Sequence, residues 1–184
     1  DSVEADEFDR SFLTLQPTMC VVTNLDLEHL DCYENLADLS NAFAQFCNAT
    51  PFYGTVSLCI DSQNVMKIIP IIKRPIVTFG FSQDADYQAT NVKYESGSSQ
   101  FDVTAFGENL GKIELNIPGK HNIQNTLGAI TMALELEVPF TKIQNGISNY
   151  TGVRRRFEIK HITKNDILII DDYAPVSYTH LTLP

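Results

Sequence analysis

Acidic, amide and imidazole side chains gather in the segment "TNLDLEHLD", residues 23–31, directly after the apolar run "MCVV". Carboxylates and a neutral imidazole both bind Mg²⁺ or Mn²⁺, so this pattern indicates a site for a metal ion and phosphate that includes His29. The alternative is a polar loop that leads into a helix, with His29 in solvent. The local pattern leaves both interpretations open.

A second polar cluster lies in "PGKHNIQN", residues 118–125, where Gly119 allows a tight turn. His121, Asn122 and Asn125 crowd the first turn of the helix that we expect to follow. The His121 ring is suited to stack on a purine base, and the Asn122 and Asn125 amides are suited to form hydrogen bonds with it. An Asn at a helix start is, however, ordinarily an N-cap, and capping is the alternative interpretation.

A third cluster consists of three consecutive arginines, Arg154, Arg155 and Arg156, in "GVRRRFE". Guanidinium groups match phosphate oxygens in a bidentate way. The alternative is a solvated basic run on a linker. Because the whole chain has only 13 Lys and Arg residues, three in a row indicate an anion site about as strongly as a linker.

Metal, phosphate and purine together indicate an enzyme that uses a nucleotide. The pattern GxxxxGK[ST] of the common phosphate-binding loop does not occur in the 184 residues. Either the chain is not a nucleoside triphosphatase, or its phosphate loop lies upstream of Asp1. The first residue is not Met, which favours a segment of a longer protein.

Composition narrows the class of protein. The formal net charge of −10 argues against nucleic acid and against an anionic membrane as partners. No apolar run approaches the length of a membrane span, and no signal peptide is recognisable. The four cysteines form no CxxC pair, so we expect small buried residues rather than zinc ligands or disulfides. This usage suits a reducing cytoplasm.

Short apolar runs predict the strands that position these clusters. They are rich in β-branched residues, as strands buried in a parallel sheet are, and they comprise residues 18–24, 54–61, 74–81 and 166–172. An amphipathic helix over residues 33–50 separates the first two strands, which predicts a strand–helix–strand crossover. Ligands bind at the carboxyl ends of such strands, where residues 23–31 lie.

The remaining segments complete an α/β fold. Helices are predicted over residues 122–135 and 141–149 from their apolar spacing. Residues 86–119 alternate apolar with polar side chains and predict antiparallel strands. The expected architecture is a mostly parallel sheet flanked by helices, with a small antiparallel sheet and a domain boundary near Gly152.

Six segments recur together, in this order: "EADEFDRSFLTLQPTMCVVTNLDLEHLDCY", "PFYG", "TFGFSQDADY", "NIPGKHNIQNTLGAI", "GVRRRFE" and "IIDDYA". This series resembles the central ATP-binding domain of the Mur ligases, within them the branch that adds L-alanine, and it covers residues 1–174. The resemblance implies a central domain over residues 1–152 without its N-terminal phosphate loop. It implies the start of a Rossmann-like C-terminal domain over residues 153–174. "PVSYTHLTLP", residues 175–184, departs from the family, and we expect a non-native tail there.

The resemblance also implies roles for individual residues. Glu4 and His29 match positions that hold Mg²⁺ near the γ-phosphate of ATP, and Asn24 with His29 would contact the substrate. Glu4, His29 and Arg156 would be the catalytic residues.

Nucleotide contacts follow from the same resemblance. His121, Asn122 and Asn125 match the adenine pocket. Arg156 matches a phosphate contact at the domain hinge, and Asp172 matches a nucleotide contact from the C-terminal domain.

The implied reaction uses ATP and Mg²⁺, with Mn²⁺ as a possible substitute. An acyl phosphate formed on the lactyl carboxylate of UDP-N-acetylmuramate would react with L-alanine, a step of peptidoglycan biosynthesis. The expected protein is cytoplasmic, a monomer or weak homodimer, and this segment alone is expected to be inactive. The alternatives are a murein tripeptide ligase of the same superfamily, a non-catalytic nucleotide-binding module, and a purely structural α/β domain.

Overall fold

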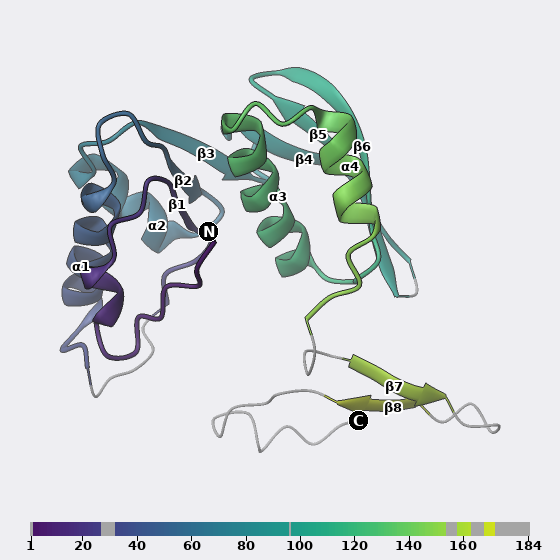
Figure 1. The fold of residues 1–184 in the computed structure, drawn as a ribbon, viewed down its shortest axis with the longest axis horizontal. Coiled ribbons are helices and arrows are strands. Elements are labelled where there is room, and N and C mark those ends of the chain that lie inside the picture. Colours follow the sequence, from purple (N-terminus) through teal and green to yellow (C-terminus); the bar gives the residue numbers. More distant parts are fainter. Residues whose placement is uncertain (1, 27–31, 96, 154–157, 163–167, 172–184) are drawn as a thin grey trace. The chain divides into compact units, whose positions relative to one another are not determined.

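The chain divides into two compact units, Asp1–Ser148 and Asn149–Pro184. The computed structural model describes residues 2–26, 32–95, 97–153, 158–162 and 168–171 (Figure 1). The second unit contains an antiparallel hairpin of β7 (Glu158–Ile162) and β8 (Leu168–Asp171). The apolar run at residues 166–172 therefore contributes a hairpin strand, and the expected domain boundary near Gly152 stays a prediction.

The first unit is built on one six-stranded sheet with the order β1-β2-β3-β4-β5-β6. Neighbouring strands run parallel from β1 to β4 and antiparallel from β4 to β6. The strands are β1 (Cys20–Val22), β2 (Val56–Cys59), β3 (Ile76–Gly80), β4 (Tyr87–Glu95), β5 (Ser98–Ala105) and β6 (Glu108–Leu115).

The first three predicted parallel strands and the predicted antiparallel strands are therefore confirmed, but they share a single sheet. The prediction of a parallel strand at residues 166–172 is wrong, because β8 pairs antiparallel with β7 in a separate hairpin. The start of β4 makes the connection, because Phe79 pairs with Tyr87 and Gly80 with Gln88 in parallel register. The rest of β4 then pairs with β5 in the antiparallel direction. The expected separate antiparallel sheet is thus an extension of the parallel one.

Helices cover both faces of the sheet (Figure 1). Asn35 begins α1, since its side chain accepts a hydrogen bond from the Asp38 N–H. A six-residue helix, α2, follows β2 and has no counterpart in the sequence predictions. The helices are α1 (Leu36–Ala49), α2 (Gln63–Ile68), α3 (Lys120–Glu135) and α4 (Phe140–Ser148), with short 3₁₀ helices at Ser11–Thr14 and Ile69–Ile71. None of the helices in the described part is long and apolar enough to cross a membrane.

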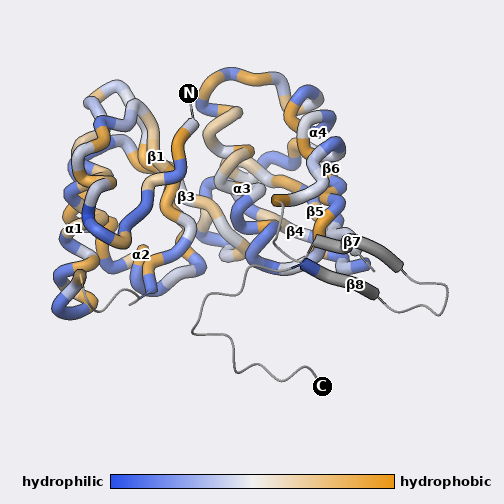
Figure 2. The backbone as a smooth tube through the Cα atoms, turned by 60° about the horizontal axis from the view of Figure 1, so that its bottom comes forward, coloured by the Kyte–Doolittle hydropathy of each residue, from blue (hydrophilic) through white to orange (hydrophobic). Residues whose placement is uncertain are grey.

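Two hydrophobic cores result, one on each face. Alternate residues of β2 point to opposite faces, so Val56 and Leu58 pack with α1 and α2, whereas Cys59 packs with α3. Figure 2 shows the apolar character of the strands β1 and β3 between these helices. This division explains why the strands read as nearly continuous apolar runs.

The cysteines behave as predicted. Cys20, Cys47 and Cys59 are buried free thiols, and Cys32 is half-buried and also free. Burial raises the pKa of the Cys59 thiol. Contact with Cys20, together with burial, raises the pKa of the Cys47 thiol. Cys47 and Cys59 thus fill space in the cores and are poor nucleophiles.

Gly128 brings α3 close to the sheet. A Cβ atom there would lie 2.9 Å from Val21 Cγ1 and 3.2 Å from Phe79 Cζ. Both partners are strand residues that face α3. The absence of a side chain therefore sets how closely α3 packs on β1 and β3.

We expect Gly128→Ala to destabilise the fold by about 1–3 kcal/mol, because the added methyl group overpacks this contact. Gly146 in α4 is the matched control, since a Cβ there meets nothing within 4 Å. Gly146→Ala should stabilise by up to about 1 kcal/mol through helix propensity. Denaturant unfolding monitored by circular dichroism measures both, and a Gly128→Ala variant as stable as the wild type would contradict this packing.

Candidate functional site

The carboxyl ends of β1, β2 and β3 lie at one edge of the sheet. The parallel register aligns Val22 with Leu58 and Leu58 with Thr78, so the segments that follow these strands emerge together. The first turn of α3 reaches the same edge, where the Lys120 ammonium lies 5.2 Å from the centre of the Phe81 ring. This edge therefore gathers residues 23–26, the described part of the first polar cluster, and the second cluster at residues 118–125.

A cavity of about 1020 Å³ extends along β1 to this edge. Glu4 and Asn24 both line it, with Thr23 and Asp26 beside them. Its apolar lining includes residues of the N-terminal segment, β1, α1 and the end of α3, among them Phe12, Val22, Phe43 and Met132. The structure thus brings Glu4 and Asn24, which are far apart in sequence, to one cavity.

Carboxylate and amide side chains contribute to the polar part of this lining. The Glu4 carboxylate is exposed, and the Asn24 amide donates a hydrogen bond to the Asp26 carboxylate. Carboxylate and amide oxygens are the donors that Mg²⁺ prefers, so the residues fit this ion. Across the residues that the structure describes, no three His, Cys, Asp or Glu side chains converge on one metal position. The predicted partner ligand, His29, lies outside the described residues.

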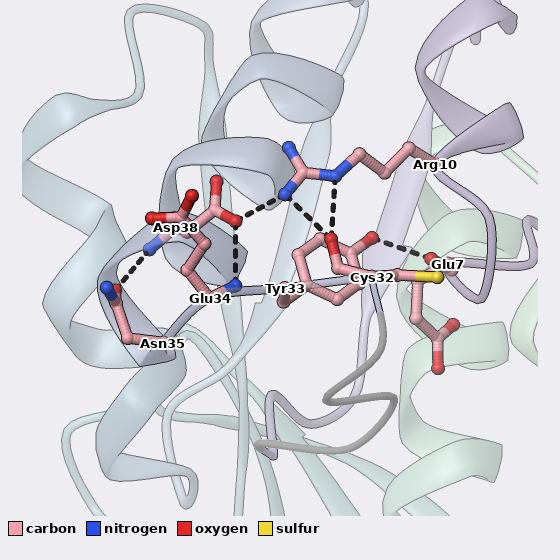
Figure 3. A network of polar contacts seen from close by, with 7 residues as sticks. All are labelled: Glu7, Arg10, Cys32, Tyr33, Glu34, Asn35 and Asp38. Carbon is pink, nitrogen blue, oxygen red and sulfur yellow. Dashed lines mark hydrogen bonds and ion pairs between the residues drawn. The ribbon is translucent and has the colours of Figure 1, made fainter.

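Arg10 ties the acidic N-terminal segment to the start of α1 (Figure 3). Its Nε and Nη2 atoms donate to the Cys32 carbonyl oxygen at 3.1 and 2.9 Å, and Nη2 also pairs with Asp38. The guanidinium carbon lies 4.6 Å from the centre of the Tyr33 ring. One cation thereby holds three groups that follow residues 27–31 in the chain.

Tyr33 adds a second link between the same segments. Its side chain is 1% exposed, and its hydroxyl donates to the Glu7 carbonyl oxygen at 2.6 Å (Figure 3). Arg10 itself has φ 62, a left-handed conformation that is uncommon outside glycine. We call the contacts of Arg10 and Tyr33 with Glu7, Cys32 and Asp38 the N-terminal clamp.

The sequence patterns indicated no role for Arg10, although one signal was present. Arg10 is the first Lys or Arg of the chain and directly follows an acidic stretch. Two of the neighbouring acids cap local turns, since Asp6 accepts from the Phe8 N–H and Asp9 from the Ser11 N–H, each at 2.9 Å. The clamp leaves Glu4 as the acid of this segment that both lines the cavity and is exposed.

The first turn of α3 presents the three residues predicted to contact a purine. His121 and Asn125 are exposed, and Asn122 is half-buried. Gly119 occupies the N-cap position with no side-chain capping bond, so the capping interpretation of the asparagines is wrong. Asn122 Nδ2 instead donates to the Pro118 carbonyl oxygen at 2.6 Å and closes the turn that enters the helix.

Asp61 is a polar residue at this edge that the sequence patterns missed. Its carboxylate accepts from the Phe81 N–H at 3.0 Å and from Gln124 Nε2 at 2.8 Å. It therefore connects the end of β2 with the loop after β3 and with α3. The remaining predicted residues, Arg156 and Asp172, lie outside the described part of the chain.

Comparison with known proteins identifies the family. Residues 2–133 match the Mur ligase middle domain. The chain therefore belongs to the Mur ligase family and contains its middle domain, as the six sequence segments predicted.

Curated relatives share this region at high identity. A UDP-N-acetylmuramate–L-alanine ligase of Syntrophobacter fumaroxidans is 47% identical over 171 residues, which are 93% of this chain and 36% of the relative. The enzyme of the same name from Salinibacter ruber is 44% identical over 172 residues, which are 94% of this chain and 36% of the relative. The chain thus spans little more than a third of the length of these relatives.

Solved structures confirm the α/β fold. The UDP-N-acetylmuramate–alanine ligase MurC of Thermotoga maritima matches with a TM-score of 0.77 and 25% identity, over 92% of this chain and 38% of that one. MurF of Acinetobacter baumannii matches with a TM-score of 0.77 and 23% identity, over 90% of this chain and 36% of that one, which supports the fold alone.

We expect Arg10→Lys to loosen the N-terminal clamp, because a lysine cannot place two donors on the Cys32 carbonyl and pair with Asp38. Hydrogen–deuterium exchange of residues 2–13 should then become roughly tenfold faster. Arg74→Lys is the matched control, since Arg74 also donates to carbonyl oxygens, those of Thr50 and Lys73, before β3. Unchanged exchange in Arg10→Lys would show that the clamp does not hold this segment.

The clamp also predicts a pH dependence. The hydrogen bond from Arg10 lowers the pKa of Asp38 below its usual 3.8. Asp38 therefore stabilises the fold above that pH, and this contribution is lost as the pH falls through its lowered native pKa. Asp38→Asn should lower the midpoint of denaturant unfolding at neutral pH, and the difference should shrink below pH 3.8. Asp84→Asn, at an exposed position, is the control. A stability difference between wild type and Asp38→Asn that does not vary with pH, or that equals the difference for Asp84→Asn, would show that the Arg10–Asp38 contact is not its cause.

Proposed function

We propose that the full-length protein containing this chain is an ATP-dependent ligase that joins L-alanine to the lactyl carboxylate of UDP-N-acetylmuramate. The observation that carries the proposal is the high identity to enzymes of that name over more than nine tenths of this chain. The cavity that Glu4 and Asn24 line, which extends along β1 to the carboxyl edge of the parallel strands, supports it. Such a reaction is a step of peptidoglycan biosynthesis in the cytoplasm.

The proposed reaction has two steps. A lactyl carboxylate oxygen attacks the γ-phosphorus of ATP, and ADP leaves, which gives an acyl phosphate. The amine of L-alanine then attacks the acyl carbon, phosphate leaves with one carboxylate oxygen, and the amine loses its proton. The first step brings two anions together, so cationic groups must offset their repulsion.

Glu4 is the proposed metal ligand of this part of the chain, with His29 as its partner. Bound Mg²⁺ would supply the positive charge that neutralises the phosphate oxygens. Asn24 lines the same cavity and is proposed to contact the substrate, together with His29. The N-terminal clamp supports these roles because it fixes the segment that carries Glu4 only three residues before Glu7.

The first turn of α3 is the proposed adenine site. His121, Asn122 and Asn125 would contact the base, since no side chain caps this helix and two of the three are exposed. Arg156 and Asp172 are proposed to contact phosphate and nucleotide from the C-terminal part of the chain. A monomer or weak homodimer is proposed for the assembly.

Phosphate release from ATP and Mg²⁺ with UDP-N-acetylmuramate, measured with and without L-alanine, tests the reaction. Release by the full-length protein should depend on L-alanine. Dependence on a tripeptide instead would favour a murein peptide ligase. ATP binding without release in the presence of any amino acid or peptide would favour a non-catalytic module.

Glu4→Gln tests the metal role in the same assay. Loss of this carboxylate should raise the half-saturating Mg²⁺ concentration roughly 10- to 100-fold, with partial rescue at high Mg²⁺. Glu108→Gln, the same change at an exposed site at the start of β6, is the control. An equal Mg²⁺ dependence in Glu4→Gln and wild type would remove Glu4 from the metal site.

A further inference from the structure

Asp61 binds the start of the loop that follows β3. Both of its carboxylate oxygens lie 3.0 Å from the Phe81 backbone nitrogen, and Oδ1 lies 3.2 Å from the Ser82 nitrogen. The other end of this short stretch is also held, since Gln88 Nε2 donates to the Phe81 carbonyl oxygen at 3.0 Å. Residues 81–82 are therefore fixed from both sides.

The same carboxylate reaches α3. Gln124 Nε2 donates to Asp61 Oδ2 at 2.8 Å. A second contact between loop and helix runs in parallel, because the Lys120 ammonium lies 5.2 Å from the centre of the Phe81 ring. Lys120 and Gln124 are one helical turn apart, so together they fix the rotation of the first turn of α3 against residues 81–82.

The approach of Asp61 to this loop depends on Gly80. A Cβ atom at Gly80 would lie 2.7 Å from Asp61 Oδ1 and 2.9 Å from its carboxyl carbon. The end of β3 therefore leaves room for the Asp61 carboxylate only because residue 80 has no side chain. This tight fit makes the position of residues 81–82 sensitive to the group at position 61.

Asp61 has little capacity left for a ligand. A carboxylate offers about four lone-pair directions. Here both oxygens share the Phe81 N–H, Oδ1 also accepts from the Ser82 N–H, and Oδ2 accepts from the Gln124 amide and lies 3.9 Å from the Cys59 sulfur. Unlike Glu4, it is not part of the cavity lining. Its role must therefore lie in placing other groups and not in binding metal or substrate itself.

The groups it places are the proposed base contacts. Within the first turns of α3, the two anchored residues, Lys120 and Gln124, directly precede His121 and Asn125 in the chain. Amide side chains discriminate between purines only when their donors and acceptors are held in register with the base edge. A small rotation of this turn would misalign them.

We infer that Asp61 is a positioning residue that sets the selectivity of this site for adenine over guanine nucleotides, through Gln124 and residues 81–82. The inference rests on the proposed function, because it takes the first turn of α3 as the base site. Asp61 is not among the predicted nucleotide contacts, and this positioning role explains why it bonds to both residues 81–82 and α3.

Calorimetric binding of AMP-PNP and GMP-PNP to the full-length protein tests the inference. Asp61→Asn keeps the shape but replaces one acceptor by an NH₂ group that faces N–H donors. We expect the ratio of the two affinities to fall roughly tenfold. Asp86→Asn is the matched control on the same loop, since Asp86 accepts from the Thr78 N–H and hydroxyl, each at 2.8 Å, and the ratio should not change.

Gln124→Leu provides a second route, because it removes only the helix side of the contact and leaves the bonds of Asp61 to the loop. It should lower the same ratio, and the double variant should show less than the product of the two effects. This variant decides the question if Asp61→Asn does not fold.

A wild type that binds neither analogue contradicts the proposed function. Wild-type selectivity for AMP-PNP that persists unchanged in the folded variants overturns the inference alone.

Discussion

The parallel pairing of β1, β2 and β3 is the constraint on which the rest of the structure depends. It places residues 23–26, Asp61 and residues 81–82 at the same edge of the sheet, although they are spread over more than fifty positions of the chain. The close packing of α3 at Gly128 then brings the first turn of that helix to the same edge. A sheet paired in any other direction would separate these groups.

Two polar contacts turn this arrangement into a defined site. Arg10 joins the segment that carries Glu4 to the start of α1, and Asp61 joins the loop after β3 to α3. The Arg10–Asp38 pair keeps 38% and 28% exposure, so solvent screens it and its net contribution to stability is small. This contact matters for geometry, because it holds the N-terminal segment beside the cavity that Glu4 lines.

Local patterns predicted most of the fold. Apolar runs located β1, β2 and β3, and the spacing of apolar residues located α1, α3 and α4, since each is long enough to show its period. The six-residue helix α2 is too short for that. The two-residue pairing between β3 and β4, which merges the parallel and antiparallel strands, leaves no trace in composition. For the candidate site, sequence motifs singled out Glu4 and His121, whose roles stay predictions. Arg10 and Asp61 act through partners 22 and 63 positions away, which spacing cannot reveal.

Photolabelling of the full-length protein with 2-azido-ATP, followed by mass spectrometry of the labelled peptide, tests whether the nucleotide binds at the carboxyl edge of the parallel strands, against the first turn of α3. Binding there should place labels on residues 81–86 or 120–125, and unlabelled ATP should suppress them. Suppressible labels at the opposite edge, on residues 50–55 before β2, would contradict it.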